Sequence, residues 1–415
     1  MPSDSLGQHA YRIVEELVVH VGPRPAGSAD ERRAMDYLAR ELEATCHDVR
    51  RLAVTGIPRP FPSQILMLTG AAFLAFCVQQ LVETPSAMLI YLLTFFALPK
   101  VISQIRQRAS AGSDRSSENL SGTQLPSGEE RAEVILCAHV DSARANRVPG
   151  DAWPRVQRAF TNLMLPTILV LSIAAALRWL DMRHAFAPLI VWQVLRAVGL
   201  AFALAFLVFE LLYAFVSRGR TFSPGANDNA SGVGVVLALA QHFHAAPPVY
   251  LKMHYVLFTA EELGLIGSQR FVKQTKMDRK RTYVINLDMV GSGKQLRYVR
   301  GSELFPPRFT DRGLNVWLRE ACPAIRGHYY WMGNSDFHPF LTKGFRAASL
   351  DVAGDSRAEA VYHTEHDTMD YIEVAALQMT ADTVCKVICR LNEMQAFAAG
   401  SMQLAADGQS VRTSD

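Results

Sequence analysis

Short β-rich runs that end at charged residues alternate along this chain with long runs that are apolar on every face. Runs at 133–138, 250–259 and 282–287 are rich in Val, Ile, Leu and Tyr, which predicts strands. Acidic or imidazole residues follow each run directly or after one residue, whereas a run that served only the core would not end in charge each time. In an open α/β sheet the ligand crevice lies at the carboxyl ends of the strands. The pattern therefore predicts an α/β fold with a site at one edge of its sheet.

Apolar residues near the N-terminus recur at helical spacing. Residues 8–20 are predicted to be helical, and a second helix is expected from a cap at Ser28 or Asp30 to about Ala44. A strand is expected at 47–54. Residues 109–131, rich in Ser and Gly, are expected to be a soluble connection.

Two apolar regions interrupt this pattern. Residues 64–82 and 86–102 are almost entirely apolar, and so are much of 163–177 and 197–216. Each run approaches the ~20 residues that cross a bilayer, and a buried core helix does not need to be apolar on every face. We therefore expect two transmembrane helical hairpins within one soluble domain. The expected organisation is 1–58, 110–158 and 217–400 for that domain, 63–103 and 160–216 for the hairpins, and 401–415 for a flexible tail.

The charges beside the hairpins predict an orientation. Arg and Lys, among them Arg59, Lys100 and Arg220, flank the hairpins on the side of the soluble domain, while the far loops hold only Arg178 and Arg183. By the positive-inside rule, the soluble domain of this multi-pass protein lies on the cytoplasmic side of the plasma (inner) membrane. No signal peptide is visible, and the six cysteines form no CxxC pair, which fits a reducing compartment.

Composition narrows the partners. The formal charge of +3 is near balance, and no basic patch with interleaved aromatic residues is visible, so nucleic acid is not an expected partner. Hydrophobic residues make up 49% of the chain, which is high for a soluble enzyme and fits the lipid bilayer as a partner. A length of 415 residues allows one large or two modest domains.

Candidate metal ligands stand at the ends of the predicted strands and in one turn. Asp228 lies in the turn Pro224-Gly-Ala-Asn-Asp-Asn-Ala-Ser-Gly232, which precedes an apolar helix. Asp in such a turn is usually structural, and Asp228 gains interest only from the other candidates. These are His139 and Asp141, the pair Glu261 and Glu262, Asp288, and His363. Aspartate, glutamate and imidazole together suit Zn²⁺.

The set is large enough for two zinc ions. Two neighbouring ions need one bridging carboxylate and about two further ligands each. Asp228 can bridge, with His139 and Asp288 for one ion and one Glu and His363 for the other. Asp141 can accept the second N–H of His139. One of Glu261 and Glu262 is then left to act as general base, and the residues alone do not say which.

The order of these motifs resembles the co-catalytic zinc aminopeptidase family (peptidase family M, number twenty-eight), which includes bacterial leucyl aminopeptidases, glutamate carboxypeptidase II and glutaminyl cyclases. The matching segments are His-x-Asp, Asn-Asp-Asn-Ala-Ser-Gly, Glu-Glu-Leu-Gly-Leu-Ile-Gly-Ser, Asn-Leu-Asp-Met-Val-Gly and Tyr-His-Thr, with Gly22-Pro-Arg-Pro-Ala-Gly-Ser28 and Ser335-Asp-Phe-His-Pro-Phe340 as weaker likenesses. The resemblance implies the zinc-exopeptidase (phosphorylase/hydrolase-like) fold, a mixed, mostly parallel sheet with helices on both faces. It also implies two zinc ions per chain, with Glu261 as base and Glu262 as ligand.

Several features depart from the family or compete with these assignments. The hairpins are foreign to its soluble members, and Phe337 stands where a His is common, which affects the expected substrate specificity. His366 is a rival ligand to His363. His254, His328 and His338 are expected to be structural or to line a pocket, and Tyr329, Tyr330 and Tyr362 to pack as aromatic residues.

The expected function is a membrane-bound, zinc-dependent exopeptidase that acts on peptides, specifically an aminopeptidase. Glu261 would activate the attacking water and then protonate the leaving amine. Glutaminyl cyclase-like acyl transfer on the same scaffold is an alternative, and metal stoichiometry would distinguish it. A non-enzymatic membrane scaffold is a second alternative, but a decayed peptidase domain should lack ligands and this chain lacks none.

Overall fold

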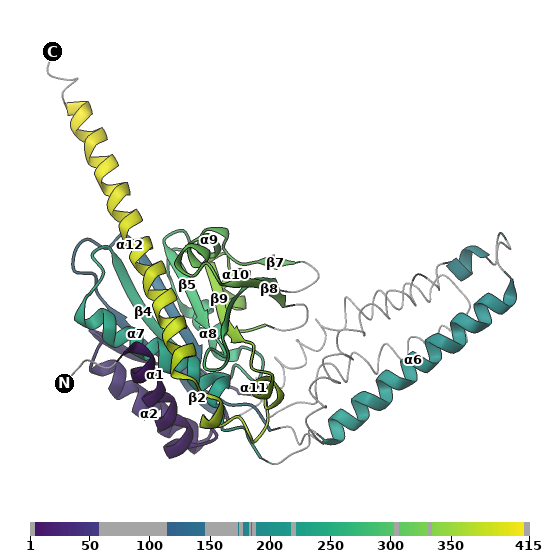
Figure 1. Cartoon of the computed structure of the whole chain (residues 1–415). Helices are drawn as coiled ribbons and strands as arrows, with labels where there is room; N and C mark the ends of the chain where they lie inside the picture. Colours follow the sequence, from purple (N-terminus) through teal and green to yellow (C-terminus); the bar gives the residue numbers. More distant parts are fainter. Residues whose placement is uncertain are drawn as a thin grey trace. The chain divides into compact units, whose positions relative to one another are not determined.

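The computed structural model describes residues 5–57, 114–145, 221–302, 307–330 and 334–410, together with 173, 177–181, 184 and 188–216. The chain divides into two compact units (Figure 1). The sheet unit consists of Met1–Ile57, Asp114–Ala145 and Thr221–Asp415, and the insertion unit consists of Pro58–Ser113 and Asn146–Arg220.

The sheet unit is built on one mixed sheet. Its described strands are β1 (Asp48–Thr55), β2 (Ser116–Gln124), β3 (Ala132–His139), β4 (Leu251–Phe258), β5 (Thr282–Leu287), β6 (Gln295–Ser302), β7 (Arg308–Phe309), β8 (Arg326–Tyr330) and β9 (Arg346–Ala353). They lie in the order β1-β2-β4-β3-β5-β9-β6-β7, and β8 pairs with β6. The strands β4, β3, β5 and β9 are parallel to one another. The pairs β1–β2, β2–β4, β6–β9 and β6–β7 are antiparallel, so the sheet is parallel at its centre rather than mostly parallel throughout.

Alternate residues of the central strands pack into separate cores on the two faces of the sheet. Leu136 of β3 and Ile285 of β5 belong to the larger core, while Cys137 and Val284, their neighbours in the chain, belong to the smaller one. Helices α1 (Leu6–Glu15), α2 (Ala29–Glu43), α7 (Ser231–Ala245), α9 (Arg312–Ala321) and α12 (Val374–Ser410) contribute to the larger core. Helices α8 (Ile266–Gln274) and α10 (Phe337–Thr342) contribute to the smaller one. The sheet is therefore covered by helices on both faces (Figure 1).

Local signals explain the N-terminal helices. Ser5 and Gln8 form a capping box at the start of α1, and the helical turn η1 (Glu16–Val21) continues it. Ser28, rather than Asp30, caps α2, where its hydroxyl accepts a hydrogen bond from the backbone N–H of Glu31 (3.0 Å).

Two expectations about irregular segments differ from the structure. The Ser- and Gly-rich connection at 109–131 contains strand β2, which pairs with β1 and β4. One reason is Asn119, whose side chain forms hydrogen bonds with the backbone of Thr259 and Gly267. These long-range bonds stabilise the strand, and local sequence propensity does not predict them. In addition, helix α12 covers residues 401–410 of the expected flexible tail, where Met, Gln, Leu and Ala favour a helix. Residues 411–415 lie outside the described residues.

The insertions leave and re-enter the sheet unit at paired points. The backbone N–H of Ile57 donates to the carbonyl of Arg115 (2.9 Å), and that of Ala145 donates to the carbonyl of Thr221 (3.1 Å). Arg144 also forms a β-bridge with Phe222. Each insertion therefore begins and ends at hydrogen-bonded neighbours.

The described part of the insertion unit is dominated by helix α6 (Leu189–Val216). Its segment Ile190–Phe209 is 20 residues long, has a mean hydropathy of 2.0 and is long and apolar enough to cross a membrane. A single helix of this kind also occurs in the cores of soluble proteins. The predicted hairpin at 63–103 and most of 160–188 lie outside the described residues.

Candidate metal centre

Three adjacent parallel strands bring candidate ligands to one edge of the sheet. His139 is the last residue of β3, Glu261 and Glu262 follow β4, and Asp288 follows β5. Because β4, β3 and β5 are neighbours and run in the same direction, their carboxyl ends meet at the same place. Two further elements complete the site: Asp228 lies in the helical turn η2 (Ala226–Ala230), and His363 follows helix α11 (Ser356–Ala360).

Asp228 joins two sets of candidate ligands. Its Oδ1 lies 3.2 Å from His139 Nε2, which is also 3.8 Å from Asp288 Oδ1. Its Oδ2 lies 3.0 Å from His363 Nε2, which is also 3.3 Å from Glu262 Oε2. Within each set, one ligand atom per residue can be chosen so that all lie within 4.8 Å of one another. Asp228 is thus the residue that the two sets share, with one oxygen directed to each.

The donor atoms fit zinc in spacing and chemistry. Two ligands about 2.0–2.2 Å from a tetrahedral ion lie about 3.3–3.6 Å apart, close to the distances between the imidazole nitrogens and carboxylate oxygens here. In addition, Glu262 Oε1 is buried and has no hydrogen-bond partner among the described residues. A buried carboxylate oxygen without a donor is costly unless a cation satisfies it. A third set, His139, Glu261 and Glu262, meets the same spacing, so the spacing alone does not separate the roles of the two glutamates.

The loop that carries Asp228 is fixed to the loop after β5. Asn227 Oδ1 accepts from the N–H of Gly291 (2.9 Å), Asn229 Oδ1 from that of Met289 (3.2 Å), and Ser231 Oγ from that of Val290 (3.0 Å). A Cβ at Gly232 would lie 2.4 Å from the carbonyl oxygen of Leu287, so this close approach requires glycine. The polar residues of the turn therefore position Asp228 against Asp288.

Asp367 holds the same turn from the other side. Its carboxylate accepts hydrogen bonds from the backbone N–H groups of Asn227 (2.8 Å) and Asp228 (3.1 Å). The side chain is buried, and burial raises the pKa of Asp367 to about 6.

Asp141 connects the strand β3 loop to the two glutamates. Its carboxylate accepts from the backbone N–H of Glu261 (3.0 Å) and of Glu262 (3.2 Å). The second nitrogen of His139, Nδ1, is 3.0 Å from the backbone carbonyl of Asp141 and 3.7 Å from its carboxylate. The acceptor for His139 is thus the carbonyl, while the carboxylate positions the glutamate turn. With Nδ1 bonded to this carbonyl, His139 directs Nε2 toward Asp228.

Asp288 and His363 are held by neighbouring side chains. Ser335 donates its hydroxyl proton to Asp288 Oδ2, and Asn286 Nδ2 donates to Ser335 Oγ (2.8 Å). The ring of Tyr362 stacks on that of His363 with centroids 3.8 Å apart. The imidazole is thereby held by an aromatic contact.

Charge in this cluster is strongly negative. Burial raises the pKa of Asp141 and of Glu261 well above their ordinary values. Burial would lower the pKa of His139 and His363, but the surrounding carboxylates raise both well above the ordinary value. Burial would also raise the pKa of Asp228, yet hydrogen bonds from the two imidazoles hold it below its usual range. The carboxylates thus favour positive charge on the imidazoles, and a divalent cation would satisfy the same demand.

The structure brings together every predicted ligand and adds residues that sequence reasoning did not assign. The additions are Arg24, Asp336 and Asp367, all buried, and the Ser335–Asn286 pair. Burial raises the pKa of Asp336 to about 7. Arg24 lies within the Gly22-Pro-Arg-Pro segment and Asp336 within the Ser335-Asp-Phe-His segment. Their place in these family-like motifs is the sequence signal that could have pointed to them.

The competing histidines have other surroundings. His366 belongs to none of the ligand sets formed by described residues. His254 lies 2.9 Å from Glu133, and His328 lies 3.0 Å from Asp351. His338 Nδ1 is 3.3 Å from the hydroxyl of Ser302.

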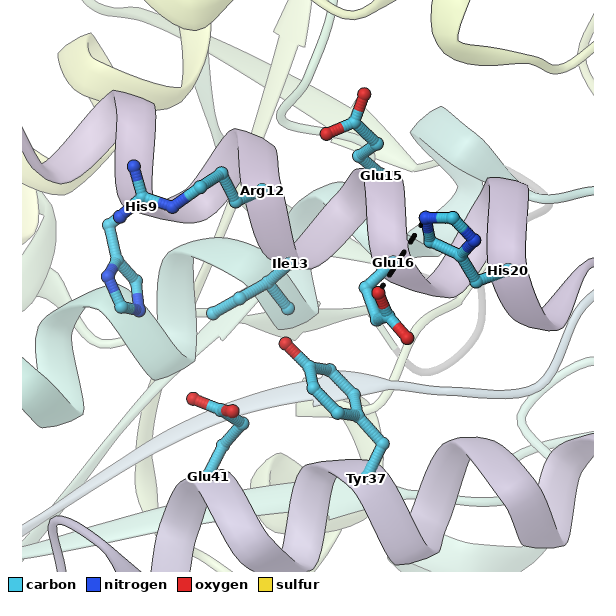
Figure 2. A pocket seen from close by; sticks show the side chains of 8 residues that line it. All are labelled: His9, Arg12, Ile13, Glu15, Glu16, His20, Tyr37 and Glu41. Carbon is cyan, nitrogen blue, oxygen red and sulfur yellow. Dashed lines mark ion pairs between the residues drawn. The ribbon is translucent and has the colours of Figure 1, made fainter.

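A separate cavity of about 320 Å³ lies between α1 with η1 and α2 (Figure 2). Its lining is polar and includes Glu16, His20, Tyr37 and Glu41, with His20 Nε2 3.9 Å from Glu16 Oε2. None of the candidate metal ligands lines it.

Comparison with known proteins agrees with this site. The family model described as Peptidase family M28 matches residues 215–388, a range that contains Asp228, Glu261, Glu262, Asp288 and His363. The chain carries a peptidase M28 domain. His139 and Asp141 precede the range matched, and the fold joins them to the M28 domain through β3.

Relatives and solved structures are consistent with this family. The chain is 33% identical over 177 residues to Aminopeptidase YwaD of Bacillus subtilis, an alignment that covers 40% of this chain and 38% of that protein. The chain therefore matches well under two thirds of the length of that relative. In structure it is similar to BSAP, a zinc aminopeptidase from Bacillus subtilis (TM-score 0.54, 18% identity, 93% of this chain and 95% of that one). A Bacteroides thetaiotaomicron glutaminyl cyclase is similar at a TM-score of 0.53 (17% identity, 92% and 97%). At these identities the structural likeness establishes the fold alone, which is the mixed α/β fold of the zinc exopeptidases.

Proposed function

We propose that this protein is a membrane-bound, zinc-dependent exopeptidase, specifically an aminopeptidase that holds two zinc ions. The observation that carries the proposal is the position of Asp228, whose two oxygens lie 3.2 Å and 3.0 Å from imidazoles of two different ligand sets. His139, Asp228 and Asp288 would hold one ion, and Asp228, Glu262 and His363 the other. The name of the Bacillus subtilis relative supports the same activity.

The chain's own residues supply the proton transfers. Bound zinc polarises a peptide carbonyl and makes water a stronger nucleophile near neutral pH. Glu261 takes a proton from the attacking water and returns it to the leaving amine. The Asp141 carboxylate, which accepts the N–H groups of Glu261 and Glu262, keeps the base and its neighbouring ligand in a fixed relation.

Charge balance favours a substrate with a free amino terminus. The cluster contains five carboxylates, those of Asp141, Asp228, Glu261, Glu262 and Asp288. Two bound zinc ions would favour the ionised form of these buried carboxylates. Their formal charge of about −5, added to about +4 from the ions, then leaves a surplus of about −1. A protonated α-amino group would offset this surplus, whereas a blocked N-terminus would not.

The test uses the purified full chain in detergent with a panel of peptides that have free or acetylated N-termini. We expect release of the N-terminal residue from free peptides only, loss of activity after chelation, and recovery with Zn²⁺ at two ions per chain. Cleavage of the acetylated peptides alone would contradict the aminopeptidase assignment. A glutaminyl cyclase would instead convert an N-terminal glutaminyl peptide without cleaving it, and would need a single working zinc ion.

The membrane part of the proposal rests on helix α6 and on the paired ends of the insertions. Ile57 bonds Arg115 and Ala145 bonds Thr221, so each insertion begins and ends at one place. An insertion with adjacent ends must cross a bilayer an even number of times. The apolar segment Ile190–Phe209 can supply one crossing, and a second must then come from the rest of 146–220. Two hairpins, 63–103 and 160–216, satisfy this condition.

The proposed orientation places the M28 domain in the cytoplasm, because Lys and Arg beside the hairpins are retained there. Single cysteines at Thr84 and at Ser116, in a background without reactive thiols, test it. A membrane-impermeant thiol reagent applied to intact cells should label position 84 and spare position 116. Labelling of position 116 alone would place the site outside.

A further inference from the structure

Arg24 is a buried cation whose bonds all go to the backbone. Its side chain is 0% exposed. Nε donates to the carbonyl of Val140 (3.0 Å), and Nη1 and Nη2 donate to those of Pro224 (2.8 Å) and Gly225 (2.9 Å). Nη1 also contacts the carbonyls of Leu17 (3.2 Å) and Gly22 (2.8 Å) in its own segment. Burial lowers the pKa of Arg24 to about 10, so it remains charged at neutral pH.

The three distant acceptors belong to the two loops that carry metal ligands. Val140 lies between His139 and Asp141, and Gly225 lies three residues before Asp228. Insertion residues Asn146–Arg220 separate these loops in the chain, so sequence proximity does not hold them together. A guanidinium can bond several carbonyls at once because its N–H groups form a planar fork.

Other contacts fit the same function. The backbone N–H of Arg24 donates to Ser142 Oγ (2.9 Å), and the N–H of Ser142 donates to the carbonyl of Arg24 (3.1 Å). Gly225 has a φ of +61°, and a Cβ there would lie 3.1 Å from Arg24 Nη2 and 2.5 Å from the carbonyl oxygen of Asp228. The turn before Asp228 is therefore shaped to admit the guanidinium.

We propose that Arg24 is a positioning residue for zinc: it joins the loop of His139 to the loop of Asp228 and so sets the 3.2 Å distance between the two ligands. Its side chain bonds neither ligand and acts through the backbone carbonyls of Val140, Pro224 and Gly225 in the two loops. This inference rests on the proposed zinc site but not on peptide cleavage. A wild-type chain that binds no zinc would overturn the proposed function, whereas the variants below test Arg24 alone.

The experiment compares Arg24→Lys with Arg281→Lys in the full chain. Arg281 also donates to two backbone carbonyls, those of Arg131 (2.8 Å) and Glu130 (3.1 Å), and both lie near the amino end of β3, the end opposite His139. Zinc affinity is measured on metal-stripped, folded protein by competition with a chelator. A single ammonium cannot reach the same carbonyls, so we expect Arg24→Lys to bind zinc about 10- to 100-fold more weakly. The control should stay within about twofold of wild type.

A purely structural role gives a different result. Arg24→Lys would then lower the unfolding temperature of the metal-free protein while zinc affinity stayed at the wild-type value, and that outcome overturns the proposal. Should Arg24→Lys fail to fold, Ser142→Ala keeps the guanidinium and removes the acceptor of the Arg24 N–H. Loss of one hydrogen bond predicts about twofold to tenfold weaker zinc binding. Wild-type affinity in that variant also overturns the proposal.

Discussion

Replacing Glu261 by Gln separates the base from the ligands. The substitution keeps the size of the side chain, and the backbone N–H of residue 261 still has its acceptor in Asp141 (3.0 Å). The two ligand sets that share Asp228 contain no atom of Glu261. We therefore expect Glu261→Gln to fold normally and to bind two zinc ions per chain.

The Glu261→Gln substitution should lower the turnover number, kcat. A positioned general base contributes about 10²- to 10⁴-fold to the rate, which corresponds to about 3–5 kcal/mol of activation free energy. An amide cannot accept the proton, so kcat should fall by about that factor. KM should rise as well, because loss of the Glu261 carboxylate removes the surplus of about −1 that would offset the substrate amine.

The assay measures kcat on a chromogenic aminoacyl substrate and counts zinc by mass spectrometry in the same samples. Glu262→Gln is the matched control, since Glu262 Oε2 lies 3.3 Å from His363 Nε2 and belongs to the set with Asp228. We expect this control to lose one zinc ion. Loss of a metal in Glu261→Gln, with both metals retained in Glu262→Gln, would refute this assignment, because Glu261 would then be the ligand and Glu262 the base.

Other predictions follow from the same geometry. Asp228→Asn should weaken both zinc sites, whereas His363→Asn should empty one of them; equal zinc counts in the two variants would argue against a shared ligand. Asp351 is buried, and although burial would raise its pKa, bonds from His328 and Arg297 hold that pKa below the usual value. Its stabilising effect is present above the unfolded-state pKa of about 4 and is lost as the pH falls through the lower folded value. Asp351→Asn should therefore lower the free energy of unfolding by about 3 kcal/mol at pH 7. In urea denaturation, the gap between the unfolding free energies of wild type and variant should narrow below about pH 4. A gap that is constant with pH would exclude the carboxylate charge as its cause.

The strand ends that form the site could be predicted because each leaves a local trace. The run at 282–287 matches β5 residue for residue, and Asp288 follows it directly. The general rule that ligand sites lie at the carboxyl ends of strands then predicts that these residues meet. The β1–β2 pairing could not be predicted in this way, since eight of the nine residues of β2 are polar or Gly and its stability comes from neighbouring strands and from Asn119.

The supporting residues were hidden for a related reason. Arg24 bonds carbonyls more than one hundred positions away, and backbone carbonyls carry no sequence signal. Asp141 was expected to orient His139 with its carboxylate, but the backbone carbonyl does so and the carboxylate bonds the N–H groups of Glu261 and Glu262. Residue identity predicted which side chains meet, whereas the choice between a backbone and a side-chain acceptor depends on loop conformation.

The hydrogen bond between Ile57 and Arg115 also bears on how the chain folds. The strands β1 and β2 pair through Thr55 and Ser116, yet 58–113 lie between their ends in place of a tight turn. Because loop-closure entropy grows only with the logarithm of length, exchanging a turn of about four residues for a connection of this length costs about 2 kcal/mol. A connection whose own ends are brought together by a folded hairpin would cost less. The sheet can therefore form around very long connections at these two joints, and the same joints would tolerate shorter or unrelated segments without a change in strand register.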